Sequence, residues 1–417
     1  MKAGKVSKPE LMAPAGDWTM LHTAVNAGAD AVYFGVDKLN MRAKAQNFPI
    51  EDLQNISKYC EEHDVRTYLT LNTIVFEEEL DEVREIIRTA KESGIDRLIC
   101  WDLAVAQLCS EADFPFCIST QGSVSNSIAA SVYKKLGAVR IVLARECPLE
   151  EIKKIRASTD LEIEAFIHGA MCIAVSGRCF MSHHLFGQSA NRGECVQPCR
   201  REYEVYENAA DKSLIIGEDY VMSPNDLCTV EFIDQLIEAG INSFKIEGRK
   251  RSPEYVAKTV SVYRRAIDAY FDGTLNKKMK EDLLSELQQV YNRGFSSGFY
   301  FDVPSSEDYS GVEGTKATHR KEYLGKVLNF YKNKNVVHML IESGSVQTND
   351  KLLIMGETTG VVELELNSFY KDELPAAQAD KGDEITFVAD HLVRPRDKVY
   401  LFKRVKDISS ININSSK

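Results

Sequence analysis

Four cysteines lie close together near the middle of the chain: Cys172, Cys179, Cys195 and Cys199. An even spread of the ten cysteines over 417 residues would place far fewer in so short a stretch. Packing does not require such crowding, whereas thiolates gathered in this way usually hold a metal ion or an iron–sulfur cluster. We therefore expect a chemical role for this stretch.

The spacing of the four cysteines leaves three uses open. Cys195 and Cys199 form a CxxxC pair, which suits zinc about as well as it suits iron and sulfur. Cys172 and Cys179 are separated by six residues, whereas a zinc knuckle normally supplies two close pairs. An iron–sulfur cluster is therefore favoured, with zinc and redox-active or unligated thiols as alternatives. The neighbouring His183 and His184 point in different directions, and we expect neither to be a ligand.

The compartment expected for the chain bears on these thiols. The N-terminal run MKAGKVSKPELMAPAG lacks the apolar core of a signal peptide, and no run of about 18 apolar residues occurs. We expect a cytoplasmic protein with no membrane role, where disulfides are disfavoured. The other six cysteines stand singly in apolar or helical contexts and are expected to serve packing: Cys60, Cys100, Cys109, Cys117, Cys147 and Cys228.

The net charge of −11 argues against a protein that coats nucleic acid nonspecifically, because such binding depends on many lysines and arginines. A local basic site is still compatible with that charge. The candidate residues are Arg200, Arg201, Lys245, Arg249, Lys250, Arg251, Arg264 and Arg265. Solvated helix ends and ordinary ion pairs are the alternative explanation for them.

Short β-rich runs alternate with helical segments over residues 1–275 and predict a parallel (β/α)8 barrel. An open doubly wound sheet is the lesser alternative. Four joints, AGADAVYFG, SGIDRLICW, LGAVRIVLA and AGINSFKIEG, end a helix with glycine just before an apolar strand. The eight predicted strands are Glu10–Ala13, Ala31–Val36, Arg66–Asn72, Arg97–Trp101, Phe116–Thr120, Arg140–Ala144, Leu161–Ile167 and Ser243–Glu247.

A barrel of this kind carries its site at the C-terminal ends of the strands. The cysteine-rich insertion, about residues 168–228, follows the seventh strand and so falls on that face. The other polar residues predicted there are Asp17, Asn40, Arg42, Asn72, Gln121, Asn126, Arg145, His168, Glu247 and Arg249.

The pattern changes after the barrel. Residues 276–320 are expected to form a helical and irregular linker, and residues 321–406 a small C-terminal β-barrel, because runs of period two alternate with turn signals there. Residues 407–417 are expected to be a disordered tail.

Three runs resemble one known family. EAFIHGAMCIAVSGRCFMS is similar to the signature of the collagenase-like peptidase family numbered thirty-two in the unknown-mechanism class. ELMAPAGDWTMLHTAVNAGADAVYFGV and SFKIEGRKRSPEYVAKTVSVYRRAID also resemble that family. The resemblance extends over essentially the whole chain.

The resemblance implies an oxygen-independent RNA hydroxylase. The chain is similar to members of the family that convert the wobble uridine of tRNA to 5-hydroxyuridine. The resemblance implies prephenate as the hydroxyl donor and a 4Fe-4S cluster as the cofactor. The length of this chain is most like the tRNA enzymes. Carried over residue by residue, the implied cluster ligands are Cys172, Cys179, Cys195 and Cys199, with Cys228 as the alternative for the fourth. Related quinone-pathway proteins imply a possible partner, either a second copy or a paralogue.

Prephenate carries two carboxylates, so its site should present cations. We predict that Arg42, Gln121, Arg145 and Arg249 bind the substrate, and that His168, Lys245 and Glu247 take part in catalysis. For each charged residue, a structural ion pair is the alternative.

The family name also suggests a peptidase. Gly294, Ser296 and Gly298 satisfy the GxSxG pattern, but a nucleophile elbow needs a strand before the serine and a helix after it. Here a helix is predicted before the serine and an irregular stretch after it. The sequence contains no HExxH motif either. A peptidase, or a partner-binding subunit without hydroxylase activity, stays as the alternative function.

Overall fold

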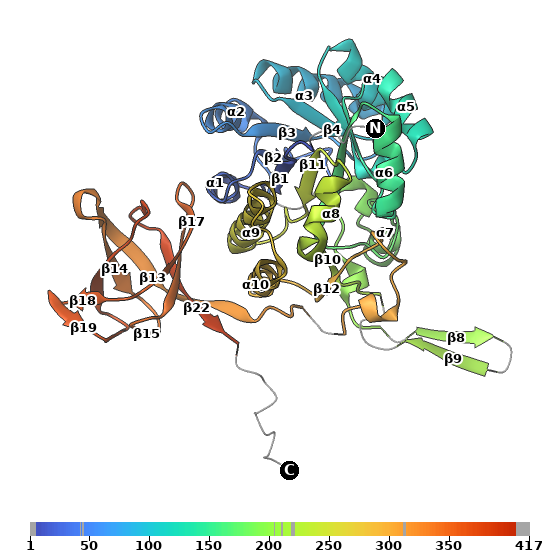
Figure 1. Ribbon diagram of the computed structural model, residues 1–417. Helices are drawn as coiled ribbons and strands as arrows, with labels where there is room; N and C mark the ends of the chain where they lie inside the picture. Colours follow the sequence, from blue (N-terminus) through green and yellow to red (C-terminus); the bar gives the residue numbers. More distant parts are fainter. Residues whose placement is uncertain are drawn as a thin grey trace. The chain divides into compact units, whose positions relative to one another are not determined.

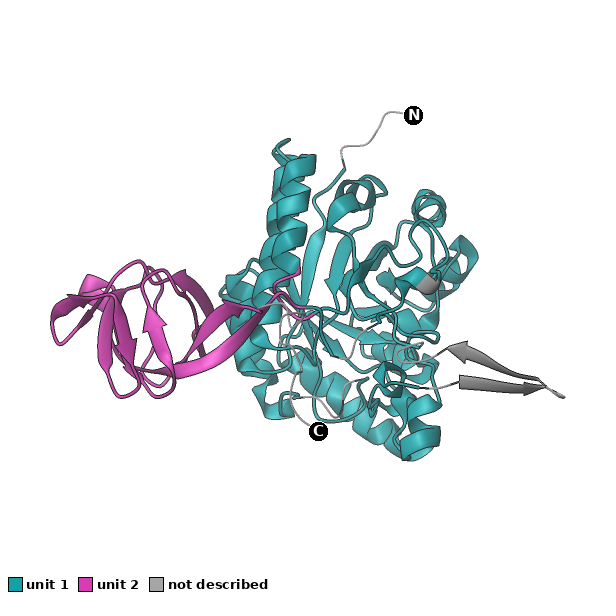
Figure 2. Ribbon diagram, turned by 90° about the horizontal axis from the view of Figure 1, so that it is seen from below, with its two compact units in different colours: residues 1–287, 292–316 teal, residues 288–291, 317–417 magenta. Residues whose placement is uncertain are grey.

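The computed structural model describes residues 6–41, 43, 46–203, 205–209, 212–217, 222–311 and 314–405. These divide into two compact units, shown in Figure 2. The first contains residues 1–287 and 292–316, and the second contains residues 288–291 and 317–417. The predicted tail and Arg42 lie outside the described residues.

The first unit is a closed parallel barrel, as predicted (Figure 1). Neighbouring strands pair in chain order, and the last strand pairs with both the first and the seventh, which closes the ring. Each strand starts within one residue of its predicted start. The strands are β1 (Glu10–Pro14), β2 (Ala31–Phe34), β3 (Arg66–Thr70), β4 (Arg97–Cys100), β5 (Phe116–Ile118), β6 (Arg140–Val142), β7 (Glu162–Gly169) and β11 (Ser243–Ile246).

A helix follows each barrel strand and covers the outside of the ring. In α3 the buried residues Val83, Ile86, Ile87 and Ala90 recur every three to four positions, so one helical face packs on the strands. The helices are α1 (Trp18–Asn26), α2 (Leu53–Glu61), α3 (Leu80–Glu92), α4 (Leu103–Glu111), α5 (Ser127–Lys135), α6 (Leu149–Ser158), α8 (Ile233–Glu238) and α9 (Pro253–Phe271). The glycines at the four predicted joints adopt the positive φ that such turns require: Gly28, Gly94, Gly137 and Gly240.

Further elements of the first unit were not predicted in detail. Two short strands extend the sheet beyond β7: β10 (Asp226–Cys228) pairs antiparallel with β7, and β12 (Phe295–Ser296) pairs parallel with β10. The cysteine-rich insertion contains α7 (Met181–Phe186), β8 (Val205–Ala209) and β9 (Lys212–Gly217). Residues expected at the start of the linker form α10 (Lys277–Leu287), which belongs to the barrel unit.

Charged side chains fill part of the barrel interior. Arg140 is 2% exposed and pairs with Glu10 at 2.6 Å, Glu162 at 2.6 Å and Glu164 at 3.1 Å. Glu164 is completely buried and accepts a further hydrogen bond from Lys245 Nζ at 2.7 Å. Burial alone would raise the pKa of Glu164, but Lys245 and Arg140 outweigh it and lower that pKa. This network fixes Lys245 at the floor of the site described below.

The second unit contains an eight-stranded antiparallel sheet and a two-stranded one, β15 with β20, and its buried apolar residues form one core. The described residues of this unit form strands with one short 3-10 turn between them, which agrees with the all-β region predicted from the sequence. The strands are β13 (His319–Tyr331), β14 (Val336–Ile341), β15 (Ser345–Gln347), β16 (Lys351–Gly356), β17 (Gly360–Glu365), β18 (Phe369–Lys371), β19 (Leu374–Ala376), β20 (Gln378–Asp380), β21 (Glu384–Val388) and β22 (Lys398–Arg404). In the described part of the chain, no helix is long and apolar enough to cross a membrane.

Candidate active site

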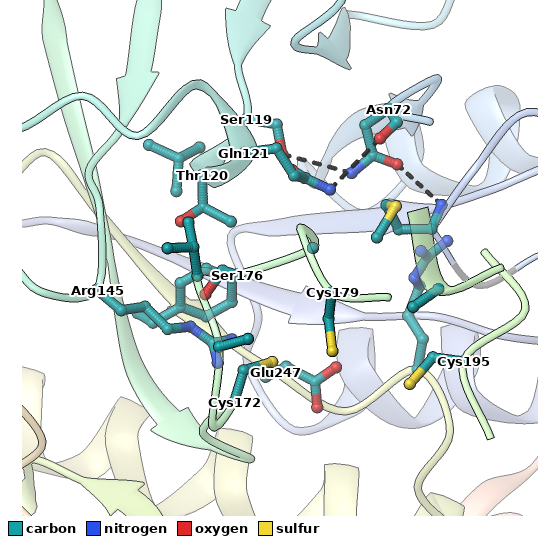
Figure 3. Close-up of a pocket in the computed structure, with 18 of the residues that line it drawn as sticks. Asn72, Ser119, Thr120, Gln121, Arg145, Cys172, Ser176, Cys179, Cys195 and Glu247 are labelled. Carbon is teal, nitrogen blue, oxygen red and sulfur yellow. Dashed lines mark hydrogen bonds between the residues drawn. The ribbon is translucent and has the colours of Figure 1, made fainter. Parts of the chain in front are cut away.

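A pocket with about 1030 Å³ of empty space, part of it open to solvent, lies at the C-terminal ends of the barrel strands. Its walls come from β-strand ends and from the cysteine-rich insertion (Figure 3). Several polar residues predicted for this face line it: Asn72, Gln121, Arg145, Glu247 and Arg249, together with Lys245 and the four clustered cysteines.

All four clustered cysteines line this one pocket. Figure 3 shows Cys172, Cys179 and Cys195 around the same space as Glu247. Burial raises the pKa of the Cys199 thiol to about 11, which Arg200 opposes and the other three cysteines reinforce. The cysteines are therefore close enough to influence one another electrostatically. Among the residues whose placement is described, however, no three His, Cys, Asp or Glu side chains converge as the ligands of a single metal ion would.

The segment that carries the cysteines, residues 170–203, is held on the barrel by basic side chains. Arg178 donates to the Gln121 carbonyl at 2.5 Å and lies 4.9 Å from the centre of the Trp101 ring. Arg192 pairs with Glu79. Because this segment contains only short helical turns, these contacts with the barrel compensate for its lack of regular structure.

Further contacts fix the two ends of the segment. Arg200 donates to the Met171 carbonyl and to the Pro224 carbonyl, the latter at 2.7 Å, which joins both ends of the insertion. Gly193 adopts a φ of +86°, and a Cβ atom there would overlap the Asn40 carbonyl. The path of this segment past the strand ends therefore requires glycine at that position.

Backbone groups also organise the cysteines themselves. The Cys179 amide donates to Asn191 Oδ1 at 3.0 Å, and the Lys250 ammonium donates to the Cys195 carbonyl at 2.9 Å. The Gln197 amide donates to the Cys195 sulfur at 3.4 Å. An amide donor of this kind stabilises negative charge on sulfur, which suits a thiolate ligand.

Three cations converge on the pocket, two of them fully buried. Lys245 is 5% exposed and lies 4.3 Å from the centre of the Tyr33 ring. Arg249 is 6% exposed and donates to Asn40 Oδ1 and to Thr70 Oγ1, both at 3.1 Å.

The third cation, Arg145, follows β6. Its guanidinium lies 4.2 Å from the centre of the Phe166 ring, and its Nη1 donates to the Ala170 carbonyl at 2.6 Å. Its Nε is buried, with no hydrogen-bond partner among the described residues. A bound anionic ligand can therefore accept one hydrogen bond here that the described residues leave unmade.

Gln121 belongs to a buried polar group of the pocket lining, together with Ser119 and Asn72 (Figure 3). Its side chain accepts a hydrogen bond from the Ser119 hydroxyl and donates to the Asn72 carbonyl at 3.4 Å. Asn72 in turn accepts from the Met41 amide at 3.1 Å. These hydrogen bonds fix two amide groups in the pocket lining.

The structure does not bring His168 into the pocket. The pairing of β7 with β11 shifts register between Lys245 and Ile246, so the inward and outward alternation is interrupted before His168. Its ring lies against Tyr255 and Tyr263 of α9, and burial lowers its pKa to about 3. His168 is therefore not among the residues that line the pocket.

Cys228 also lies outside the pocket lining. It is buried, and its sulfur accepts a hydrogen bond from the Tyr263 hydroxyl at 3.7 Å. Burial raises its pKa to about 12. Of the two candidates for a fourth ligand, Cys199 is the one that shares the pocket with the other three cysteines.

Pocket residues not singled out from the sequence include Tyr33, Thr70, Phe166 and Ser176. Tyr33 and Phe166 alternate with buried outward-facing residues along β2 and β7, so strand periodicity could have identified them as interior positions. Ser176 lies in an irregular stretch, where no periodic signal exists.

The GxSxG pattern has no nucleophile-elbow geometry. Ser296 is the last residue of the two-residue strand β12, and a turn at residues 298–299 rather than a helix follows it. This serine is not among the pocket residues.

Fold and site together define a (β/α)8-barrel protein with a thiol-lined, cation-containing pocket at the catalytic end. Residues 16–310 match the model of Peptidase family U32, and the chain belongs to that family.

Relatives with different names are about equally similar to the chain. An uncharacterized protease of Methanocaldococcus jannaschii is 42% identical over 94% of this chain and 98% of its own length. A collagenase of Porphyromonas gingivalis is 38% identical over 95% of this chain and 98% of its own. The tRNA hydroxylation protein P1 of Bacillus subtilis is 38% identical over 91% of this chain and 83% of its own.

Proposed function

We propose that this protein is a cluster-dependent RNA hydroxylase that converts the wobble uridine of tRNA to 5-hydroxyuridine with prephenate as the hydroxyl donor. The observation that carries the proposal is the single pocket lined by four thiols and three cations. The relative named for tRNA hydroxylation supports the choice of substrate.

The donor set fits an iron–sulfur cluster. Cys172, Cys179, Cys195 and Cys199 would hold it, since four thiolates are the usual ligand set of a 4Fe-4S cluster. Zinc also binds thiolates, but a zinc knuckle normally supplies two close pairs, whereas six residues separate Cys172 from Cys179. When bound, the cluster would supply electron transfer at the pocket.

The cations fit a dicarboxylate. Arg145 and Arg249 follow β6 and β11, the two strands that flank β7, and both line the pocket, so each can bind one carboxylate of prephenate. The fixed hydrogen bonds of Arg249 to Asn40 and Thr70 orient its guanidinium before substrate arrives.

Lys245 and Glu247 would handle protons. Both lie at the end of β11 and line the pocket. Lys245 is held by Glu164 and can donate a hydrogen bond to the prephenate hydroxyl as its C–O bond breaks, while the Glu247 carboxylate, 9% exposed, can accept the proton released when C5 of uracil exchanges its C–H bond for a C–O bond. Oxidation of C5 releases two electrons, which prephenate takes up as it loses its hydroxyl group. The surrounding apolar wall, including Phe166, limits water at this point.

The test is nucleoside mass spectrometry of tRNA from a strain that lacks this gene and any paralogue. The strain should lose 5-hydroxyuridine and its derivatives, and regain them when the gene is restored. Restoration with Cys172→Ala should fail, whereas Cys60→Ala, which replaces a buried cysteine of α2, should succeed. Unchanged wobble nucleosides in the deletion strain would overturn the proposal.

The collagenase relative makes a peptidase the second candidate, since its identity equals that of the tRNA protein. Degradation of denatured collagen by the purified protein, abolished by Glu247→Gln, would favour it over the hydroxylase. Ser296 lacks the geometry of a nucleophile, so a peptidase would have to use the pocket residues instead.

A further inference from the structure

Exposed apolar side chains are concentrated at the mouth of the pocket. Five of the large exposed hydrophobic residues in the described chain come from the short stretch 173–186. Phe180 is the most exposed of them, at 74%. With Arg201 they form what we call the mouth surface: Ile173, Val175, Phe180, Leu185, Phe186 and Arg201.

The mouth surface is continuous with the pocket. Ile173 and Val175 are 38% and 44% exposed and also line the pocket wall. Phe180 lies between Cys179 and Met181, both pocket residues, and its own side chain points into solvent. The mouth surface therefore adjoins the space that a substrate in the pocket would occupy.

Positive charge accompanies the aromatic rings. The Arg201 guanidinium lies 4.4 Å from the centre of the Phe186 ring, and the exposed Arg178 lies over Trp101. Between residues 170 and 203 there are four arginines and two glutamates, although the whole chain has a net charge of −11. The local charge is thus opposite in sign to that of the protein.

Aromatic faces beside cations are what a single-stranded nucleic acid requires. Bases stack on exposed rings, and arginines neutralise the phosphates between them. A base still stacked in a duplex cannot reach the bottom of an enclosed pocket, so the target base has to be unpaired or extruded.

We propose that the mouth surface binds an unpaired RNA loop. The target base passes Ile173 and Val175 into the pocket, and its neighbours stack on Phe180 and Phe186. This inference rests on the proposed function, because it assumes that the pocket acts on RNA.

The test compares two variants of the full chain, purified anaerobically with its bound group. Phe180→Ala/Phe186→Ala removes both proposed stacking faces. The control is Phe271→Ala: Phe271 is 39% exposed, against 40% for Phe186, and ends α9 at the opposite face of the barrel. Because all three side chains are exposed, the melting temperatures should stay close to that of the parent protein, which thermal unfolding checks.

Binding is measured by fluorescence anisotropy with a labelled anticodon stem–loop, a fully paired RNA duplex of the same composition, and a collagen-like peptide. The double variant should raise Kd for the stem–loop by about fivefold or more for each ring removed, with little change for the duplex. Phe271→Ala should bind like the parent. Arg201→Gln should lower the slope of log Kd against log salt by about 1.

The outcomes separate the two proposals. If the parent protein hydroxylates tRNA but the double variant binds the stem–loop as tightly as the parent, the mouth surface is not the RNA site and the proposed function stands. If the double variant loses the peptide and not the RNA, the surface serves a peptide and the inference is overturned. If the parent neither binds nor modifies RNA, the proposed function fails and this inference fails with it.

Discussion

Glu164 offers the sharpest test of how the barrel supports the site. Its carboxylate is completely buried between Lys245 at 2.7 Å and Arg140 at 3.1 Å. Glu164→Gln keeps the shape but leaves two buried cations facing a neutral amide. Removing one partner of a buried ion pair typically costs about 3–5 kcal/mol. We expect the free energy of unfolding to fall by somewhat less than this, because Arg140 keeps its ion pairs with Glu10 and Glu162.

A double-mutant cycle with Lys245→Met isolates the Glu164–Lys245 pair. Lys245→Met/Glu164→Gln removes both charges, so we expect the double variant to be more stable than Glu164→Gln alone by about 1–3 kcal/mol. Chemical unfolding followed by tryptophan fluorescence suits this measurement, since both tryptophans of the chain, Trp18 and Trp101, lie in the barrel unit.

The control for this cycle is an exposed pair of the same kind. Glu82 accepts from Lys38 at 2.9 Å, and the Lys38 side chain is 71% exposed. Glu82→Gln should leave the unfolding midpoint essentially unchanged. A Glu164→Gln variant as stable as Glu82→Gln, or additive effects in the cycle, would refute the claim that Glu164 holds Lys245 in the site.

Three further predictions concern the cluster ligands, the contact of Gly35 with Asn40 and Arg249, and the pH dependence of stability. Cys199→Ala should abolish the broad visible absorbance of the anaerobically purified protein, whereas Cys228→Ala should retain it; the reverse result would exchange their assigned roles. Gly35→Ala places a Cβ 2.6 Å from Asn40 and 2.8 Å from Arg249 Nη1, so both side chains must shift. We expect KM for prephenate to rise and the free energy of unfolding to fall by about 1–3 kcal/mol. An unchanged KM would count against Arg249 as a carboxylate-binding residue. His168 has a folded pKa of about 3 against 6.5 when unfolded, so the unfolded state binds the proton first and stability falls as pH drops from 6.5 toward 3. The free energy of unfolding should fall by about 2 kcal/mol between pH 6.5 and about pH 5, and this fall should be absent from His168→Gln. An equal fall in the variant would mean that other titrating groups cause the pH dependence.

The barrel was predictable because its signals are local. Apolar runs, amphipathic helices such as α3 and glycines at the helix ends each depend on a few neighbouring residues. β10 and β12 were missed because strands of three and two residues carry no periodicity. β10 forms by pairing with β7, and β12 forms by pairing with β10; the sequence shows neither pairing.

The site was predictable in its location and less so in its side-chain directions. The order of strands placed the cysteines, Gln121, Arg145, Lys245 and Arg249 at one end of the barrel, and the pocket contains them all. His168 differs because a register shift, invisible in a single sequence, turns it toward α9.

The interior ion network was not predicted either. Glu10, Arg140 and Glu164 come from three separate strands, and only closure of the ring brings them together.

The most direct test of the central claim is reconstitution of the reaction. The anaerobically purified protein, with its bound group, is incubated with prephenate and tRNA that lacks the modification, and the wobble nucleoside is analysed by mass spectrometry. Our account predicts that uridine gains the mass of one oxygen atom only when prephenate is present, and that Arg145→Gln slows the gain. An unmodified uridine in the presence of an intact cluster and prephenate would contradict it.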